Sequence, residues 1–358
     1  MVGVQNTSME PTLPVQAKDH YLILHANPSP EQEAAWRDFL TRVEMPSHYD
    51  SLGFFLEPWW QKMRPFAVLA LAGGRIVGSL TGIHAAGEVR CGHPTRPQIS
   101  FDRTANQDTV ADILVEGLMA EASRAKLATI YSWTRLPVLE RRGFRTRQME
   151  GDVVLDLTLG SDALLKQFHP NRRRNIRFAT QKGLEVSLMS GEKDIEEAYQ
   201  LHCAWRRTSR KKIVARLASL ASFKQSWGLS ENRRVFLVRH SGQLIAADVV
   251  RFYPGGLLEA AANFSLDQFL YLKPNDLVVW KIIEWACQQG FTRFSLGGAH
   301  SFLRYFGGEV VPIYRLRLDR TWLHRYDLRE AIEDAGRRAL TRTPKPVEKL
   351  VRRILGKS

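Results

Sequence analysis

The sequence contains few cysteines and no long apolar run. Its 358 residues include only Cys91, Cys203 and Cys287, which lie far apart along the chain. Three cysteines cannot form a disulfide framework, and their spacing matches no zinc motif, so we expect no bound metal and a reducing, cytoplasmic environment. No segment approaches the roughly 18 consecutive apolar residues of a membrane span. Residues 1–20 also lack the apolar core of a secretory signal peptide.

Acidic residues are in deficit as well. Asp and Glu number 37 against 51 Lys and Arg, which gives a formal net charge of +14. This excess favours an anionic partner, such as a nucleic acid, a phosphorylated substrate or an anionic membrane face. Hydrophobic residues make up 44% of the chain and charged residues 25%, and this composition excludes a mostly disordered protein. The length predicts two domains at about 100–200 residues each.

The chain contains an internal repeat. An apolar strand, a glycine turn and a second apolar strand occur at 65–82 and again at 234–249. Gly74 and Gly242, in the two turns, are 168 positions apart. Because glycine readily adopts the positive φ of a tight turn, both segments are predicted β-hairpins. Two copies of one unit are the favoured interpretation, and the alternative is a chance similarity of two α+β domains.

The elements after each hairpin follow the same order. A helix is expected at 109–126 and at 276–289, a short strand at 128–133 and at 292–296, and an alternating strand at 152–157 and at 313–318. We therefore predict an α+β protein with three parts. These are an N-terminal unit at 19–157, a C-terminal unit at 158–320 and a basic helical tail at 321–358.

Positive charge is concentrated between the two copies. Residues 161–182 predict an amphipathic helix pair that is broken at Pro170. The second helix of the pair carries four arginines: Arg172, Arg173, Arg174 and Arg177. A guanidinium group pairs with two phosphate oxygens at once, so this cluster is a candidate phosphate site. A solvated helix face is the alternative, and a second basic run at 206–216 has the same two interpretations.

The C-terminal tail is also basic. Residues 336–358 contain eight Lys and Arg residues and one acid, Glu348. After Pro346 the apolar residues recur at helical spacing, which predicts a short amphipathic helix. Three interpretations stay open for this helix: packing on its own domain, contact with tRNA, or docking on an anionic membrane surface.

Several motifs make the chain similar to a known family. They are Arg172-Arg-Arg-Asn-Ile-Arg177, Leu272-Lys-Pro-Asn-Asp-Leu277, Gln289-Gly-Phe-Thr-Arg-Phe-Ser-Leu-Gly297 and Phe302-Leu-Arg-Tyr-Phe-Gly307. Together with the repeat, they resemble the FemAB-like branch of the GNAT acyltransferase superfamily over residues 30–320. The resemblance implies two tandem GNAT-like domains, each a mixed sheet flanked by helices. It also implies transfer of an amino acid from aminoacyl-tRNA to an amine of a peptidoglycan precursor, or acylation of another cell-envelope building block.

The chain departs from the family pattern in two places, at the cationic position and at the donor loop. Many members have Phe-Lys-x-x-Phe-Gly where this chain has Leu303 at the lysine position and Arg304 one residue later. The glycine-rich loop with which CoA-dependent GNAT domains hold pyrophosphate is replaced by Lys273-Pro-Asn-Asp276, without glycine. No permanently bound cofactor is expected, and both aminoacyl-tRNA and acyl-CoA stay open as donors.

The resemblance supplies candidate site residues. Tyr305 occupies the place where GNAT domains often have a tyrosine that protonates the leaving group, and Arg304 is the candidate cation beside it. Asn263, with Asp248, lies on a predicted strand and is a candidate for orienting an amine or water. The candidate substrate-binding residues are Arg172, Arg173, Arg174, Arg177, Lys273 and Phe302. For Tyr305 the alternative is a packed side chain, and for Asn263 a polar residue at a strand end.

The favoured function is an N-acyltransferase that modifies an amine of a cell-envelope or other anionic precursor. One alternative is a CoA-dependent N-acetyltransferase of a sugar or small amine. The other is a non-catalytic relative that binds RNA or a membrane. The expected partners are an anionic small-molecule or lipid-linked precursor, tRNA and, through the tail, the inner face of the membrane.

Overall fold

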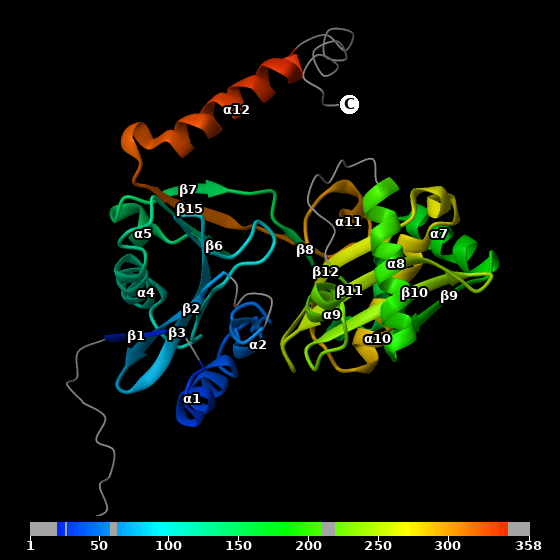
Figure 1. Ribbon diagram of the computed structural model, residues 1–358, viewed down its shortest axis with the longest axis horizontal. Helices are drawn as coiled ribbons and strands as arrows, with labels where there is room; N and C mark the ends of the chain where they lie inside the picture. The colour runs from blue at the N-terminus through cyan, green and yellow to red at the C-terminus, as the bar shows by residue number, and fades with distance from the viewer. Residues whose placement is uncertain (1–19, 26, 58–62, 209–218, 343–358) are drawn as a thin grey trace, which may run out of the picture.

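The computed structural model of the protein describes residues 20–25, 27–57, 63–208 and 219–342. Two β-sheets, each flanked by helices, form two domains that lie side by side (Figure 1). This is the α+β architecture that the sequence predicts. Among the described helices, none is long and apolar enough to cross a membrane.

The first sheet has eight strands in the order β1-β2-β3-β4-β6-β15-β7, with β5 paired to β3. Its strands are β1 (His20–Leu24), β2 (Pro65–Ala72), β3 (Arg75–Ala85), β4 (Glu88–Cys91), β5 (Ile99–Phe101), β6 (Leu127–Ser132), β7 (Arg145–Gln148) and β15 (Tyr314–Asp319). The helices of this domain are α1 (Pro30–Leu40), α2 (Leu52–Phe55), α4 (Gln107–Glu121) and α5 (Pro137–Arg141).

The second sheet has seven strands in the order β14-β8-β13-β12-β11-β10-β9. Its strands are β8 (Asp152–Asp156), β9 (Leu184–Leu188), β10 (Arg233–His240), β11 (Gln243–Phe252), β12 (Leu257–Ser265), β13 (Arg293–Ser295) and β14 (Glu309–Val311). The helices around it are α6 (Ser161–Gln167), α7 (Pro170–Gln181), α8 (Glu192–Thr208), α9 (Leu220–Trp227), α10 (Pro274–Gln288) and α11 (Ser301–Arg304), with 3-10 turns η1 (Leu157–Leu159) and η2 (Asp267–Leu272). A further turn, η3 (Trp322–His324), leads into α12 (Arg325–Arg342).

The two hairpins occupy equivalent places in the two sheets. β2 pairs with β3 and β10 with β11, and both turns have positive φ at their two central residues, Gly73 and Gly74 in one and Ser241 and Gly242 in the other. That is the type I′ geometry, which matches the twist of antiparallel strands. The register shifts at Ala70/Leu71 in the first hairpin and at Val238/Arg239 in the second. The turn and the irregularity therefore recur together, as a duplicated unit requires.

The last strand of each unit lies in the sheet of the other unit. The sequence assigns 152–157 to the first unit, but β8 lies between β13 and β14 of the second sheet. It assigns 313–318 to the second unit, but β15 lies between β6 and β7 of the first sheet. Both segments are strands as predicted, and their placement is corrected. Because each domain needs a strand from the other half of the chain, neither sheet is complete without the other half.

Helices form where the apolar spacing predicts them. The expected helices at 109–126 and 276–289 are α4 and α10, and α10 buries Leu277, Val278, Ile282 and Ile283 in the core of the second domain. The basic segment forms α6 and α7, and Pro170 is the first residue of α7, where a missing N–H costs no hydrogen bond. The basic run at 206–216 lies mostly outside the described residues, as does the tail after residue 342.

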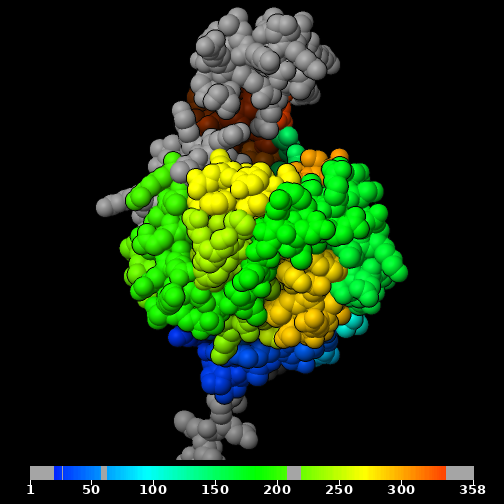
Figure 2. All heavy atoms as spheres, turned by 90° about the vertical axis from the view of Figure 1, so that its right-hand side faces the viewer, coloured from blue at the N-terminus to red at the C-terminus, as the bar shows by residue number. Residues whose placement is uncertain are grey.

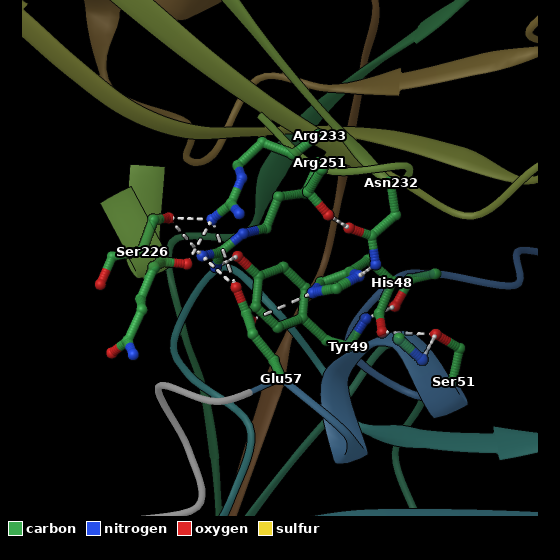
Figure 3. Close-up of polar contacts among 12 residues, drawn as sticks. His48, Tyr49, Ser51, Glu57, Ser226, Asn232, Arg233 and Arg251 are labelled. Atoms are coloured by element: carbon green, nitrogen blue, oxygen red, sulfur yellow. Dashed lines mark hydrogen bonds and ion pairs between the residues drawn. The ribbon is translucent and has the colours of Figure 1, made fainter. Parts of the chain in front are cut away.

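A buried ionic cluster joins the two domains. Glu57, from the segment after α2, lies between Arg233 of β10 and Arg251 of β11 (Figure 3). The Glu57 Oε1 atom is 3.0 Å from Arg251 Nη2 and 3.4 Å from Arg233 Nη1. Arg251 also donates to the Tyr49 hydroxyl at 3.1 Å. In Figure 2 the N-terminal part of the first domain (blue) is visible below the second domain.

Burial sets the charges in this cluster. The three ionic side chains are at most 9% exposed. Burial acts to raise the pKa of Glu57, but the contact with His48 and the two guanidinium charges outweigh it, and the pKa lies below its usual value. Burial also lowers the pKa of His48, so its ring is uncharged at neutral pH. One carboxylate therefore pairs with two cations. Without Glu57, both buried guanidinium groups would lack a carboxylate partner at the domain boundary.

We predict that Glu57→Ala lowers the free energy of unfolding by about 3–5 kcal/mol, because it leaves two buried guanidinium groups without a carboxylate. Denaturant unfolding followed by circular dichroism measures the change. Glu33→Ala is the control, since Glu33 forms an exposed pair with Arg37 on α1. Its loss should cost less than about 1 kcal/mol. Equal effects of the two substitutions would contradict a joining role for Glu57.

Candidate functional site

A cleft opens where β12 leaves β13. The two parallel strands pair only from Leu257 to Glu259, opposite Arg293 to Ser295, although β12 continues to Ser265. A cavity of about 740 Å³ lies at this divergence. Its walls come from β12, α10, β13 and α11. They are mostly apolar and include Val279, Ile282, Phe294, Leu296, Phe302 and Leu303.

A bulge interrupts β12 beside the cleft. Val249 of β11 pairs with Ala262 and Val250 pairs with Ala260, so Ala261 is an extra residue with no partner in the ladder. Residues 260, 261 and 262 are all alanines and all line the cleft. Small side chains leave room for a substrate close to the strand. A bulge also leaves backbone groups unpaired, and a free N–H group in such a place can polarise a carbonyl.

The first domain contributes Arg96 to this cleft. Arg96 lies on the loop between β4 and β5, and its Nη2 donates to the carbonyl oxygens of Ala260 and Ala261, at 2.8 Å each. Its guanidinium group also lies 5.2 Å from the centre of the Tyr49 ring. Arg96 therefore fixes the bulge of β12 from across the domain boundary and lines the cavity.

Polar side chains form a connected group on one wall. The Asn263 Nδ2 atom donates to Asp248 Oδ2 at 3.2 Å and to Asn275 Oδ1 at 3.4 Å. Ser265 Oγ donates to Asn275 Oδ1 at 2.5 Å and contacts Asn263 Oδ1 at 3.0 Å. These residues come from β11, β12 and the first turn of α10, so the group ties the two strands to the helix.

Asp248 is the titratable centre of this group. It stands in the apolar strand β11 and is 6% exposed. Burial raises the pKa of its carboxyl group from 3.8 to about 7, and the hydrogen bond from Asn263 opposes this only in part. A carboxyl with this pKa both accepts and releases a proton near neutral pH, which suits it to general acid-base chemistry.

The N-terminus of α10 also faces the cleft. Lys273 adopts a left-handed conformation (φ 62, ψ 41) just before the helix, and no side chain caps the first turn. Asn275 of that turn lines the cavity. The partial positive charge of a helix N-terminus is therefore available at the cleft, with Lys273 beside it.

Arg172 is part of the packing around the cleft. Its Nη1 atom is 2.6 Å from Asp276 Oδ1, and its guanidinium group lies 4.1 Å from the centre of the Phe302 ring. The side chain is 12% exposed. Arg172 thus neutralises the buried Asp276 and connects α7, α10 and α11. It supports Phe302, which lines the cleft, and its Nη1 is engaged by a carboxylate of the protein itself.

The other arginines of α7 lie on the surface. Arg173 donates to the carbonyl oxygen of Lys166 at 2.6 Å. Arg174 and Arg177 are exposed, and among the described residues neither side chain has a hydrogen-bond or ion-pair partner. They are three positions apart and share one side of the helix, outside the residues that line the cavity.

The predicted catalytic residues divide between the cleft and its surroundings. Asn263 lines the cavity, but Tyr305 and Arg304 are not among the lining residues. The Tyr305 ring stacks on His169 with centroids 4.6 Å apart, and it is 43% exposed. Arg304 donates through Nε to the carbonyl oxygen of Ala299. Leu303 is buried in the cleft wall and makes it apolar where many family members have a lysine.

Sequence reasoning missed Arg96 and gave Asp248 a minor place. A single carboxylate inside the apolar run of β11, Ile245-Ala-Ala-Asp-Val-Val250, is a usable signal, because an unpaired acid is seldom buried without function. No comparable signal marks Arg96, because its role depends on the contact between the domains.

A possible metal-binding group lies away from the cleft. Ligand atoms of Asp319, His324 and Asp327 lie within 4.8 Å of one another. Asp319 already accepts hydrogen bonds from Thr321 and from the backbone N–H groups of Tyr326 and Asp327. Asp327 pairs with Arg145 and Arg317. These partners satisfy the carboxylates, and the group caps the start of α12.

Comparisons with known proteins confirm the fold. Residues 167–306 match the family model described as an acetyltransferase (GNAT) domain. FemX is similar over 83% of this chain and 96% of its own, with a TM-score of 0.60 and 11% identity. The C-terminal DUF2156 domain of a putative lysylphosphatidylglycerol synthetase from Agrobacterium fabrum is similar over 86% of this chain and 96% of its own, with a TM-score of 0.57 and 16% identity.

A tandem GNAT protein from the clavulanic acid biosynthesis pathway has a TM-score of 0.54 and 13% identity, and the similarity covers 85% of this chain and 99% of that one. None of the curated proteins matches the sequence significantly. The chain therefore has the tandem GNAT fold, and its neighbours include the FemAB-like proteins that the sequence resembles.

We predict that Asp248→Asn stabilises the protein increasingly as the pH rises. The carboxyl titrates at about 7 in the folded chain and at 3.8 in the unfolded chain, so the folded state binds more protons between these values and the wild type loses stability as the pH rises through them. Asn keeps the shape without this cost. Between about pH 5 and about pH 8 the variant should gain roughly 2.5–3 kcal/mol of stability relative to the wild type. Denaturant unfolding at the two pH values measures it, and a constant difference would contradict the buried titration.

Proposed function

We propose that this protein is an N-acyltransferase whose reaction takes place in the cleft between β12 and β13. One observation carries the proposal. A buried carboxyl with a pKa near neutrality, Asp248, lies in the one wall of the cleft that also holds Asn263 and the N-terminus of α10. Amine acylation needs a proton acceptor, a donor of hydrogen bonds to the carbonyl and a dry space for the acyl group. Asp248, the backbone at the β12 bulge and the apolar wall of the cleft are the candidates for these three roles.

The residues divide the chemistry as follows. A protonated amine first loses one proton to Asp248, which passes it to solvent. The amine nitrogen then attacks the donor carbonyl carbon, and the C–N bond forms while a backbone N–H group at the β12 bulge stabilises the negative oxygen. The C–O or C–S bond of the donor breaks. The second proton of the nitrogen passes through Asp248 to the leaving oxygen or sulfur, which restores the carboxylate.

The donor is an activated acyl or aminoacyl group on an anionic carrier, either aminoacyl-tRNA or acyl-CoA. Lys273, the α10 N-terminus and the exposed Arg174 and Arg177 supply positive charge on the carrier side. The structural neighbour described as a putative lysylphosphatidylglycerol synthetase supports an aminoacyl donor and a lipid acceptor. The apolar Leu303 in the cleft wall supports a neutral acyl group and keeps the CoA thioester as the second candidate.

The direct test is product mass. Purified protein is incubated with mixed aminoacyl-tRNA or with a panel of acyl-CoA thioesters, in the presence of amino sugars, amino-acid amides and lipid-linked wall precursors. A product heavier by one acyl or aminoacyl group identifies donor and acceptor together. Absence of transfer from every donor, with protein that binds tRNA or lipid, would favour the non-catalytic alternative.

We predict that Asp248→Asn lowers kcat/KM by about 100- to 10,000-fold, the usual contribution of a general base. In the wild type, kcat/KM should rise with pH through about 7, because the carboxyl must be ionised to accept the proton. The variant should lose this ascending limb and stay folded. If kcat/KM of the variant still rose with pH through about 7, the titrating group would be a residue other than Asp248.

We predict that the double variant Arg174→Ala/Arg177→Ala binds the anionic carrier more weakly than the wild type. Its affinity should also depend less on salt, and its melting temperature should be unchanged. Two fewer phosphate contacts should reduce the slope of log affinity against log salt by roughly 1.5–2. Arg37→Ala/Arg135→Ala is the matched control. It removes the same charge from two exposed arginines that already pair with Glu33 and Glu140. If both double variants lost the same affinity for the carrier, the effect would come from net charge and not from contacts of Arg174 and Arg177.

A further inference from the structure

Helix α12 faces the protein with its acidic side. Asp327, Glu330 and Asp334 are spaced three and four apart and share one face of the helix. Asp327 Oδ2 is 3.1 Å from Arg145 Nη1, and Asp334 Oδ2 is 2.8 Å from Arg147 Nη1.

Glu330 is the centre of this contact. Its Oε2 atom is 2.5 Å from Arg315 Nη2 and 2.8 Å from Arg317 Nη1 on β15. Charge therefore holds α12 on β7 and β15.

The opposite side of α12 is apolar and faces solvent. Leu328 is 53% exposed and Ile332 is 63% exposed, and the two are one helical turn apart. The preceding turn adds Trp322 and Leu323, which are 81% and 62% exposed. A helix on a globular surface normally turns its apolar side toward the body and its charges outward. This helix is inverted, because its acids contact the first sheet while Leu328 and Ile332 stay exposed. In Figure 1, α12 extends away from the two sheets beyond β7 and β15.

The turn before α12 holds its two apolar residues outward in an unusual conformation. Leu323 and His324 both have positive φ, 60 and 46. A bulky residue with positive φ is disfavoured, so this backbone persists because Asp319 caps the first turn of α12 through the N–H groups of Tyr326 and Asp327. Trp322 and Leu323 are thus presented by a fixed turn that the helix cap maintains.

Positive charge borders the apolar side. Arg325 and Arg329 lie one turn apart among Leu328 and Ile332, on the face away from the three acids. Arg329 is 81% exposed and makes an exposed pair with Glu333 at 3.0 Å. The sequence that follows the described residues, 343–358, adds five Lys and Arg residues and one Glu. The outward side of α12 and the chain after it are therefore apolar and cationic together.

We propose that η3 and the outward side of α12 dock on an anionic lipid surface. Such a surface accepts a helix lying in its plane with leucine, isoleucine and tryptophan in the interface and arginine at the phosphate level. A single projecting helix edge offers little area for a second protein, but it suits a flat, deformable surface. α12 rises on the side of the molecule where α11 lies, and Phe302 and Leu303 of α11 line the cleft. The docking does not depend on acyl transfer.

The test compares full-length proteins by sedimentation with vesicles of phosphatidylcholine alone or mixed with phosphatidylglycerol. Leu328→Gln/Ile332→Gln keeps good helix formers and removes the apolar side. We expect the wild type to bind the mixed vesicles and the double variant to lose about tenfold or more of that affinity. Leu159→Gln/Leu229→Gln is the matched control, because these leucines are 48% and 50% exposed elsewhere on the surface. It should bind like the wild type.

Three outcomes would overturn the proposal. Equal binding by wild type and double variant would show that another surface meets the lipid. A lower melting temperature of the double variant without loss of binding would show that the face packs on the protein itself. A change from dimer to monomer without vesicle binding would identify a second copy as its partner. The same comparison is made in a chain that ends at Arg342. The double substitution should still lower vesicle affinity there, and an unchanged affinity would assign docking to residues 343–358 alone.

Discussion

The buried carboxylate of Glu57 is the constraint on which the arrangement of the two domains depends. It comes from the first domain and holds Arg233 and Arg251 of the second domain within a region that excludes water. Removing ions from water is costly, and the cost is met only when opposite charges meet in one geometry. The contact therefore favours one relative placement of the domains over all others. That placement brings the loop after β4 to β12, where Arg96 reaches the carbonyl oxygens of Ala260 and Ala261.

The exchange of β8 and β15 has the same effect through the backbone. Each strand pairs on both sides next to the edge strand of a sheet that comes mainly from the other half of the chain. The alternating pattern predicted both strands, because alternation reflects which side chains are buried. It carries no information about which neighbouring strand each one pairs with. It did not predict the exchange, since both sheets offer an apolar strand the same hydrogen bonds. The repeat itself was predictable because Gly74 and Gly242 mark equivalent turns, and positive φ leaves a trace in sequence.

The position of a candidate site residue was predictable where it depends only on the element that carries the residue. Asn263, predicted on a strand of the second unit, and Phe302, of the Phe302–Gly307 motif, both line the cleft. Prediction failed where the environment comes from another element. Arg172 belongs to a cluster that suggests phosphate, yet it neutralises Asp276 and lies on Phe302, because α10 brings a buried acid to it. Tyr305 follows Leu303 and Arg304 by sequence, but the short helix α11 turns Leu303 into the cleft and leaves Tyr305 on His169.

The duplicated units differ in the strand beside the cleft. β12 is nine residues long and separates from β13 after Glu259, whereas its counterpart β4 is four residues long and pairs with β6 along its whole length. The chain after β4 turns at Gly92 with φ 98, and a Cβ there would lie 2.8 Å from the carbonyl oxygen of Arg96. Only glycine permits this turn, which sends the loop across to the second domain. The loop between β4 and β5 thus carries Arg96, which supports the bulge of β12. The second domain forms most of the cleft, and the first domain contributes Arg96 to its wall.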